Sequence, residues 1–377
     1  MAQILADEQT RQGQTSSVLS VIQSDLRSAP LSAPLHTLAA GVDEYVLKSP
    51  DFPAPISVLR DASPGLESAI TREAEIIHLH GINGALNVRA LTTVAKGRRV
   101  VWTLHDMNPF TGACHYSLGC TRFVSGCAGC PAVKAPFRRS VTSHLAKKIA
   151  AISEIPNLSV VAPSSWLADL ARESATFRKH QVTVIPNPVS PAFLINSDDR
   201  RGSDPARGFR AVAIAKNLSD PVKDIDKAVS AFHEATIGIA NAELILVGRG
   251  GEEFRRRNVH LLGPLNTLGL AQELSQCDAL IVPSKAENAP LVIAEAAAKG
   301  CLPLVADVGG MREMILTLGH GETFSSPREL ASLIQGQIAL QAQGESTDRN
   351  TIAQSARSAF SPEAIVARYG KVYEGKE

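Results

Sequence analysis

Short runs of β-branched and aliphatic residues alternate along the chain with longer segments in which apolar residues recur at helical spacing. In the first half these runs are SSVLSV, EIIHLHG up to Gly81, RVVWTLHD up to Asp106, LSVVAPS up to Ser164 and VTVIPN up to Asn187. Strands that alternate with helices are typical of βαβ units and a parallel sheet. This half of the chain therefore predicts an α/β domain.

The same pattern restarts after the polar stretch SDDRRGSDPARG at 197–208, with the runs FRAVAIAK, AELILVG, VHLLGPL, ALIVPS and CLPLVA. In the closing segment, Ser361 stands where a helix N-cap is expected and Pro362 at the first helical position. We predict two facing Rossmann-like, doubly wound α/β domains with a cleft between them. Their expected bounds are 1–190 and 209–360, with a linker at 191–208 and a helix at 361–377 that crosses back to the first domain.

Composition narrows the class of protein. With 377 residues, of which 44% are hydrophobic and 20% charged, the chain is too long for one ordinary core. A net charge of +1 gives no field that would attract a nucleic acid. The start MAQILADEQTRQGQ is polar and acidic, unlike a signal peptide, and no apolar run is long enough to span a membrane. We expect a cytoplasmic protein with at most peripheral contact at the inner face of the membrane.

Two glutamates follow the run ALIVPS. Glu287 is expected in a loop and Glu295 about 12 Å farther along a helix that starts near Pro290. They are too far apart to share one proton or one metal ion, but they suit two hydroxyl-bearing ends of an elongated ligand whose phosphate lies at the helix N-terminus. From spacing alone, two solvated carboxylates are an equally good interpretation.

This segment resembles the E-x7-E motif of family four of the retaining glycosyltransferases, which have two facing Rossmann-like domains of GT-B type. The resemblance implies that Glu287 contacts the donor hexose and Glu295 the ribose. The usual Gly-Phe-Gly after the first Glu is replaced by an Asn-x-Pro version similar to that of exopolysaccharide-type members. Backbone recognition of the sugar and diphosphate is expected from Asn288, Ala289, Pro290 and Leu291.

Other segments of the second half agree with this family layout. AIAKNLSDPVKDIDKAV resembles the donor-phosphate segment and implies that Lys223 binds phosphate, although from the residues alone Lys223 is typical of a surface lysine. Asn217, with Lys216 beside it, stands where the family has Arg, and Asp224 where it has Gly. Further donor-pocket residues are expected at strand ends and in the turn of CLPLVADVGGMREMI: Gly248, Arg249, Gly309 and Gly310.

The first half contains HLHGINGALNV and VVWTLHDMNPFTGACHYSLGC, which resemble exopolysaccharide and colanic-acid-type members of the same family. The resemblance places His105 beside the transferred sugar. For His80 two interpretations stay open, a residue that lines the acceptor side and a structural histidine, and the second is favoured because a lone histidine at a strand end is more often structural. The resemblance implies transfer of a hexosyl group from a UDP- or GDP-sugar to a saccharide or lipid-linked saccharide, with retained configuration and no catalytic metal. The expected catalytic residues are His105, Glu287 and Lys223.

Four cysteines crowd into one segment with the spacing C-x5-C-x6-C-x2-C: Cys114, Cys120, Cys127 and Cys130. Four thiolates in one loop can close a tetrahedral zinc site that replaces a local core. Disulfides need an oxidising compartment, which the polar amino-terminal segment does not indicate. We favour structural zinc over free thiols, with disulfides third.

Two other function classes stay open. Family members begin with a strand and a Gly-rich loop before the helix that MAQILADEQTRQG resembles, and this chain begins at that helix. A non-catalytic nucleotide-sugar-binding or partner protein with a truncated amino-terminal domain is therefore the alternative. An epimerase of similar build is third, because the Trp-Thr-Leu-His-Asp and cysteine segments resemble the transferases.

Overall fold

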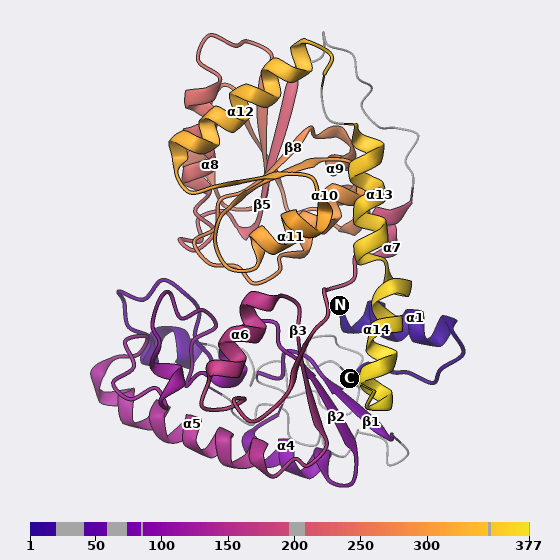
Figure 1. The fold of residues 1–377 in the computed structure, drawn as a ribbon. Coiled ribbons are helices and arrows are strands. Elements are labelled where there is room, and N and C mark those ends of the chain that lie inside the picture. The colour runs from indigo at the N-terminus through magenta and orange to yellow at the C-terminus, as the bar shows by residue number, and fades with distance from the viewer. Residues whose placement is uncertain (20–40, 59–73, 84–85, 196–207, 346–347, 377) are drawn as a thin grey trace. The chain divides into compact units, whose positions relative to one another are not determined.

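The computed structural model describes all residues except 20–40, 59–73, 84–85, 196–207, 346–347 and 377 (Figure 1). The chain forms two compact units, and each is described by itself. The amino unit comprises residues 2–186 and 366–377, and the carboxyl unit comprises residue 1 and residues 187–365. In the described part of the chain, no helix is long and apolar enough to cross a bilayer.

The amino unit is built on a parallel sheet whose described strands follow the order of the chain. These are β1 (Ile76–Leu79), β2 (Arg99–Thr103), β3 (Leu158–Ala162) and β4 (Val182–Val184). Alternate residues of β2 and β3, namely Val100, Trp102, Val160 and Ala162, lie in one core, in which Trp102 meets Phe177 edge to face with ring centroids 5.9 Å apart. These runs are apolar because a parallel sheet buries both faces.

Helices and turns surround this sheet, and α4 packs against α5. Asn87 caps α4 by accepting a hydrogen bond from the Ala90 N–H at 2.8 Å, and Ser164 caps α6 in the same way. The elements are α1 (Ala2–Arg11), η1 (Val42–Leu47), α4 (Val88–Ala95), η2 (Asn108–Phe110), η3 (Arg122–Val124), η4 (Ala135–Phe137), α5 (Arg138–Ser153) and α6 (Ser165–Glu173).

Helix α14 (Pro362–Glu374) begins at the predicted cap, where Ser361 Oγ accepts a hydrogen bond from the Ala364 N–H at 3.3 Å. Its tyrosines bind the strands of the amino unit. The Tyr369 hydroxyl is 2.8 Å from Thr103 Oγ1, and the Tyr373 hydroxyl is 2.7 Å from His78 Nδ1. The end of the chain is thereby fixed to β1 and β2.

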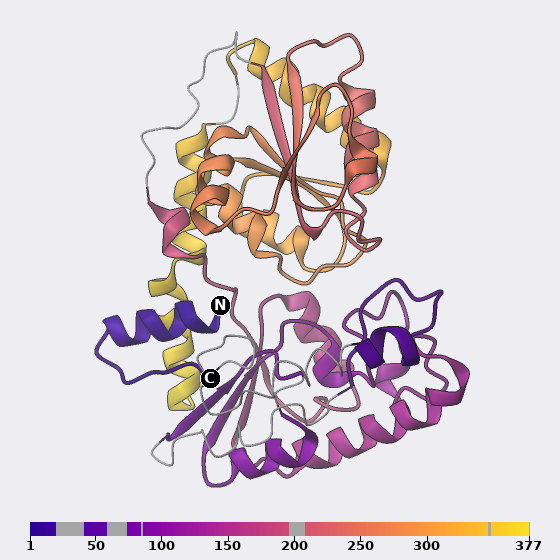
Figure 2. The same cartoon turned by 180° about the vertical axis from the view of Figure 1, so that it is seen from behind.

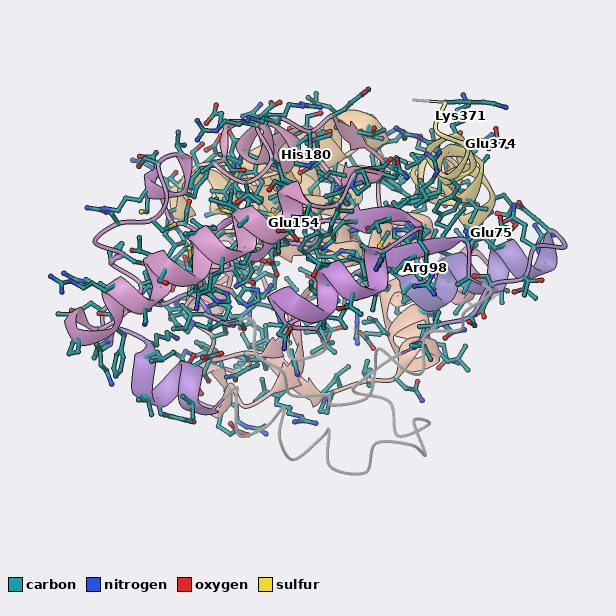
Figure 3. All side chains as sticks on the ribbon, turned by 90° about the horizontal axis from the view of Figure 1, so that it is seen from below. Glu75, Arg98, Glu154, His180, Lys371 and Glu374 are labelled. Atoms are coloured by element: carbon teal, nitrogen blue, oxygen red, sulfur yellow. The ribbon has the colours of Figure 1, made fainter. Side chains whose placement is uncertain are left out.

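The strands of the amino unit begin at the edge seen in Figure 3, where Glu75 and Arg98 precede β1 and β2, and Glu154 and His180 precede β3 and β4. Arg98 Nε donates to the Ala74 carbonyl oxygen at 3.0 Å and so joins the starts of the first two strands. The chemistry-bearing residues predicted from the sequence follow the strands, so they belong to the opposite edge.

The carboxyl unit contains a six-stranded parallel sheet in the order β10-β9-β8-β5-β6-β7. Its strands are β5 (Phe209–Asn217), β6 (Ala242–Arg249), β7 (Val259–Gly263), β8 (Ala279–Val282), β9 (Leu302–Ala306) and β10 (Glu322–Phe324). The chain starts in the middle of the sheet at β5, moves outward to β7, and returns beside β5 with β8. Loops that follow β5 and β8 therefore lie next to each other.

Helices cover both faces of this sheet. Figures 1 and 2 show α8 (Ile225–Ala235) and α12 (Pro327–Ala342) together on one face, and α10 (Leu291–Ala298) with α13 (Arg349–Phe360) on the other. The remaining helices are α7 (Pro191–Leu194), η5 (Glu252–Phe254), α9 (Thr267–Gln276) and α11 (Met311–Leu318). The two-Rossmann-domain prediction is confirmed by these two parallel α/β units.

Two local predictions differ from the structure. The run SSVLSV was expected to be a strand, but residues 16–19 are irregular, and residues 20 and 21 lie outside the described residues. Leu19 is 45% exposed, so this run does not supply the buried face that stabilises a strand. The short strand β10 was not predicted, because its three residues, Glu-Thr-Phe, give too short an apolar pattern.

Candidate functional site

Glu287 is the buried carboxylate at the carboxyl edge of the carboxyl-unit sheet. Glu287 lies in the loop that follows β8, and its side chain is only 7% exposed. The ammonium of Lys223, which follows β5, contacts Glu287 Oε1, and Ser284 Oγ donates to the same oxygen at 3.2 Å. A buried carboxylate needs such partners, because unpaired burial of a charge is costly. The structure thus brings together two of the predicted site residues.

Lys285 joins the loops that carry these two residues. Its backbone N–H donates to the Val222 carbonyl oxygen at 2.8 Å, and its ammonium donates to the Pro221 carbonyl oxygen at 3.1 Å. The same ammonium lies 3.3 Å from the Asp224 carboxylate. These contacts hold the segment around Lys223 against the end of β8.

Asp224 stands where the family resemblance implies a glycine. Its φ of 53° lies in the left-handed region that favours glycine and that aspartate tolerates better than most residues. Its carboxylate also pairs with Lys227 at 2.7 Å. Asp224 in place of glycine therefore keeps the left-handed turn, and its carboxylate binds Lys227 and Lys285.

The Gly309–Gly310 turn packs directly against the backbone of Glu287. A Cβ atom added at Gly309 would lie 1.7 Å from the Glu287 carbonyl oxygen, and the φ of Gly309 is 61°. The Gly310 N–H donates to that carbonyl at 3.4 Å. Only glycine fits at Gly309, because both the conformation and the space exclude a side chain.

Another glycine lies where β5 and β6 end. A Cβ atom at Gly248 would lie 1.9 Å from the Ala215 carbonyl oxygen, so the two strands approach closely there. Beside it, the Arg249 carbonyl accepts a hydrogen bond from Leu218, and the side chains of three polar residues at this edge are exposed: Lys216, Asn217 and Arg249. The structure does not link these three to Glu287 by any hydrogen bond or ion pair among the described residues.

Helix α10 begins at Leu291, directly after the expected Pro290, and carries Glu295 on its second turn. Before it, Asn288 is 3% exposed, and the Ala289 carbonyl accepts a hydrogen bond from Asn187 Nδ2 at 3.4 Å. Burial raises the pKa of Glu295 to about 7. A carboxyl group that is half protonated near neutral pH can both donate and accept hydrogen bonds.

In the amino unit, His105 lines a small pocket at the ends of β1 and β2. Its Nε2 lies 3.0 Å from His80 Nδ1. Burial lowers the pKa of His105 to about 4, although the Asp106 charge acts in the opposite direction, so the ring is neutral at physiological pH. The pocket is lined by Gly81, Ile82, Asn83, Trp102, Thr103, His105, Asp106, Asn108 and Pro109.

A second hydrogen-bond network links Asp106, His115 and Ser57. It was not predicted from the sequence, because these residues come from three separate segments of the polypeptide. Asp106 Oδ2 is 2.6 Å from His115 Nδ1, and His115 Nε2 is 2.9 Å from Ser57 Oγ. Burial opposes ionisation of Asp106, but His115 and the Asn108 N–H keep its pKa below the ordinary value. This network fixes the loop after β2 to residues 55–57.

The four clustered cysteines are free thiols in the structure. Burial raises the pKa of Cys114 to about 12 and that of Cys127 to about 11. Nowhere in the described ranges do three or more His, Cys, Asp or Glu side chains gather in an arrangement that could hold a metal ion. Four cysteine thiolates are suitable ligands for zinc, but in the structure the four sulfurs do not lie close enough together to form a site. Zinc at Cys114, Cys120, Cys127 and Cys130 therefore stays a prediction.

Lys148 is fully buried beneath these loops and was not singled out from the sequence. Its ammonium donates to the carbonyl oxygens of Asn108 at 2.7 Å and Thr111 at 2.9 Å. A signal was present, because Lys148 continues the buried stripe of α5 that contains Val141, Leu145 and Ile152.

Both units match models of glycosyltransferase families. Residues 2–193 match the model described as Glycosyltransferase Family 4, and residues 210–340 match the one described as Glycosyl transferases group 1. The first match covers more than half of the chain, and the two together cover most of both Rossmann-like units.

Similar proteins agree with these matches. The chain is 24% identical over 336 residues to a protein of Escherichia coli K12 provisionally described as the colanic acid biosynthesis glycosyl transferase WcaC, covering 82% of this chain and 79% of that protein. The fold of the present chain is similar to that of Anabaena HepE, which was solved in complex with UDP-glucose. The TM-score is 0.58 and the identity 17%, and the match covers 98% of this chain and 88% of HepE.

Sucrose-phosphate synthase from Thermosynechococcus elongatus is similar with a TM-score of 0.56, 19% identity and coverage of 80% of this chain and 73% of that one. At these identities the solved structures establish the fold, which is the GT-B arrangement of two Rossmann-like domains.

Proposed function

Because the chain belongs to Glycosyltransferase Family 4, we propose that it transfers a hexosyl group from a nucleoside diphosphate sugar to a hydroxyl group, with retention of the anomeric configuration. Glycosyl transfer follows from the family, whereas the donor, the hexose and the stereochemistry are the proposal. The observation that carries it is the contact between the Lys223 ammonium and the Glu287 carboxylate. A cation beside a carboxylate suits a ligand that offers phosphate oxygens and sugar hydroxyls side by side.

The donor is proposed to lie along the edge of the carboxyl-unit sheet at which its strands end. Glu287 accepts hydrogen bonds from the hexose, and Lys223 binds the diphosphate together with the backbone N–H groups at the start of α10. Glu295 binds the ribose hydroxyls. Residues at neighbouring strand ends and turns complete the expected donor contacts: Lys216, Asn217, Gly248, Arg249, Asn288, Ala289, Pro290, Leu291, Gly309 and Gly310.

In the proposed reaction, the bond between the anomeric carbon and the diphosphate oxygen breaks, and a bond from this carbon to the acceptor oxygen forms on the same face. As the acceptor hydroxyl attacks, its proton passes to the departing diphosphate oxygen on the same face of the sugar. Negative charge develops on the departing diphosphate, and Lys223 and the N–H groups of α10 are positioned to stabilise it. We propose that these groups serve in place of a catalytic metal ion.

His105 is proposed to hydrogen-bond to a sugar hydroxyl. Its neutral ring suits this role better than an imidazolium, because one nitrogen can accept while the other donates. The nearby pocket in the amino unit supports the proposal, since His105 and Asp106 are among the residues that line it.

The acceptor is proposed to be a saccharide or a lipid-linked saccharide used in exopolysaccharide synthesis. This follows the description of the Escherichia coli relative as a colanic acid biosynthesis enzyme. We propose a cytoplasmic protein with at most peripheral contact at the inner face of the membrane. A UDP-sugar is the first donor to test, because the HepE structure contains UDP-glucose, and a GDP-sugar is the second.

We also propose a structural zinc ion held by the four clustered cysteines. Two of the sulfurs accept hydrogen bonds that would also stabilise a thiolate: the Gly112 N–H reaches Cys127 Sγ at 3.4 Å, and Arg122 Nη1 reaches Cys120 Sγ at 3.7 Å. Zinc binding requires the four sulfurs to converge from their positions in the structure. Metal analysis of the purified protein is expected to find zinc that is lost in Cys127→Ser, and metal-free wild-type protein would refute the proposal.

The donor proposal is tested by thermal shift against UDP-, GDP- and ADP-sugars. A ligand that binds only the folded protein raises its melting temperature by mass action. We expect a shift with a UDP- or GDP-sugar that is lost in Glu295→Ala and kept in Glu322→Ala, where the exposed Glu322 serves as control. The absence of a shift with every nucleotide sugar would contradict the proposal.

A further inference from the structure

Two histidines stand at neighbouring strand ends of the amino unit. His80 follows β1 directly, and His105 follows β2, which pairs with β1 in register through Leu79 and Trp102. His80 Nδ1 lies 3.0 Å from His105 Nε2, and the rings stack at 5.3 Å with an angle of 22° between their planes. Two ring nitrogens at this distance form a hydrogen bond.

This hydrogen bond couples the protonation of the two rings. Burial lowers the pKa of both imidazoles, so each ring carries a single N–H at neutral pH. Of the four combinations of neutral tautomers, only two place one N–H on the line between the nitrogens. The other two set N–H against N–H or lone pair against lone pair, and each forfeits the hydrogen bond.

The two histidines differ in what they can reach. His105 lines the pocket together with Gly81, Ile82, Asn83 and Asp106, whereas His80 is not among the residues that line it. His80 is packed from behind by His78, whose ring centre is 4.2 Å away. The side chain of His80 therefore reaches this pocket through its hydrogen bond to His105, whereas its backbone leads to Gly81.

His78 is itself held firmly, which limits how the His80 ring can move. His78 Nε2 lies 2.8 Å from Thr103 Oγ1, and His78 Nδ1 lies 2.7 Å from the Tyr373 hydroxyl. Both hydrogen bonds of His78 are to residues other than His80, so they do not compete with the hydrogen bond between His80 and His105.

We propose that His80 is a positioning residue that fixes the orientation of the His105 ring and couples the tautomer of His105 to its own. By setting the proton at His105 Nε2, it decides whether the other ring nitrogen of His105 donates or accepts a hydrogen bond with a sugar hydroxyl. The inference rests on the proposed role of His105 in glycosyl transfer. It assigns a function to a histidine for which the sequence alone favoured a structural role over a place on the acceptor side.

The test compares two substitutions at His80. In His80→Asn, the amide nitrogen or oxygen is bonded to Cγ, as Nδ1 is in histidine, so a hydrogen-bonding group stays opposite His105 Nε2. In His80→Leu, this group is replaced by a methyl group of similar placement. The two variants therefore differ in the hydrogen bond more than in the volume that they fill.

The first measurement is ¹⁵N nuclear magnetic resonance of histidine-labelled protein, with His105→Gln used to assign the His105 signals. We expect a single neutral tautomer of His105 in the wild type and in His80→Asn, and a mixture or the opposite tautomer in His80→Leu. Unchanged His105 nitrogen shifts in a folded His80→Leu protein would overturn the proposal.

The second measurement is transfer kinetics with the donor identified by thermal shift. We expect His80→Leu to lower kcat roughly tenfold with little change in donor Kd, and His80→Asn to recover most of the loss. Equal losses in both variants would overturn the proposal in favour of a structural role. If the wild type transfers no sugar, the proposed function fails, whereas the resonance experiment still decides whether His80 sets the His105 tautomer.

Discussion

The ammonium of Lys223 and the carboxylate of Glu287 form an ion pair across the ends of β5 and β8. Each neutralises the other while no ligand is bound. In the proposed donor complex, a diphosphate beside the lysine and a sugar hydroxyl beside the glutamate replace this contact. We propose that the pair keeps both side chains in place for the donor.

Substitution of Lys223 by Met is expected to lower kcat by about 10²–10³-fold, because a cation aimed at the leaving diphosphate is lost. Donor Kd should rise less than kcat falls, since the charge on the diphosphate grows during the reaction. Steady-state kinetics together with donor titration measure both quantities. Lys371→Met, at an exposed position on α14, is the control, and equal kinetics in the two variants would contradict the role.

Glu295 predicts a pH dependence of stability. Its pKa is raised by burial from the ordinary 4.5 to about 7, so the folded state favours the protonated form. The stability that this form contributes is fully present below pH 4.5, and it falls as the pH rises to about 7. The corresponding free energy is about 3 kcal/mol at most.

Urea unfolding from pH 4 to 8 checks this dependence. The free energy of unfolding of the wild type should decline relative to that of Glu295→Gln between pH 4.5 and 7, and the difference should be constant above pH 7. A difference that does not vary with pH would show that folding does not raise the pKa of Glu295.

Gly309→Ala is expected to disturb Glu287, because the added methyl group would overlap the Glu287 carbonyl oxygen. Gly319→Ala is a matched control: its φ of 66° is similar, but a Cβ atom there meets nothing within 4 Å. The control should lose about 1 kcal/mol of stability from backbone strain alone. Gly309→Ala should lose more and weaken donor binding at least about tenfold, whereas equal effects in the two variants would contradict the close packing.

Lys148→Met is expected to destabilise the amino unit by about 2–4 kcal/mol, because the Asn108 and Thr111 carbonyl oxygens lose the ammonium donor and Asn108 keeps, among the described residues, only the Thr111 N–H at 3.4 Å. The neighbouring Lys147 is exposed, and Lys147→Met should change stability by less than about 0.5 kcal/mol. Urea midpoints of the two variants measure the difference. Similar midpoints would mean that water reaches the Asn108 and Thr111 carbonyls.

Much of the fold was predictable from the apolar runs, because each buried parallel strand leaves a short aliphatic segment in the sequence. The position of Glu287 after β8 and of Lys223 after β5 was predictable for the same reason. Their contact was not, since it depends on β8 returning beside β5, and strand order leaves no local signal. Only the resemblance to the family indicated that both residues serve one ligand.

Contacts between distant segments were harder to predict. Ser57, Asp106 and His115 come from three loops, and nothing in their local sequence indicates that they meet. The His80–His105 hydrogen bond required the register of β1 and β2, which is fixed by packing across the sheet. Lys148 was recognisable as a lysine on an apolar helical stripe, but its carbonyl partners were not.

The central claim is tested most directly by proton magnetic resonance of the anomeric signals while the protein consumes its donor. An α-linked nucleotide sugar is expected to give a product that is initially α, whether the acceptor is a saccharide or water, and Glu287→Gln should slow its formation about 10²-fold or more. An initial β product would contradict retention, and donor consumption that is unaffected by Glu287→Gln would contradict the proposed site.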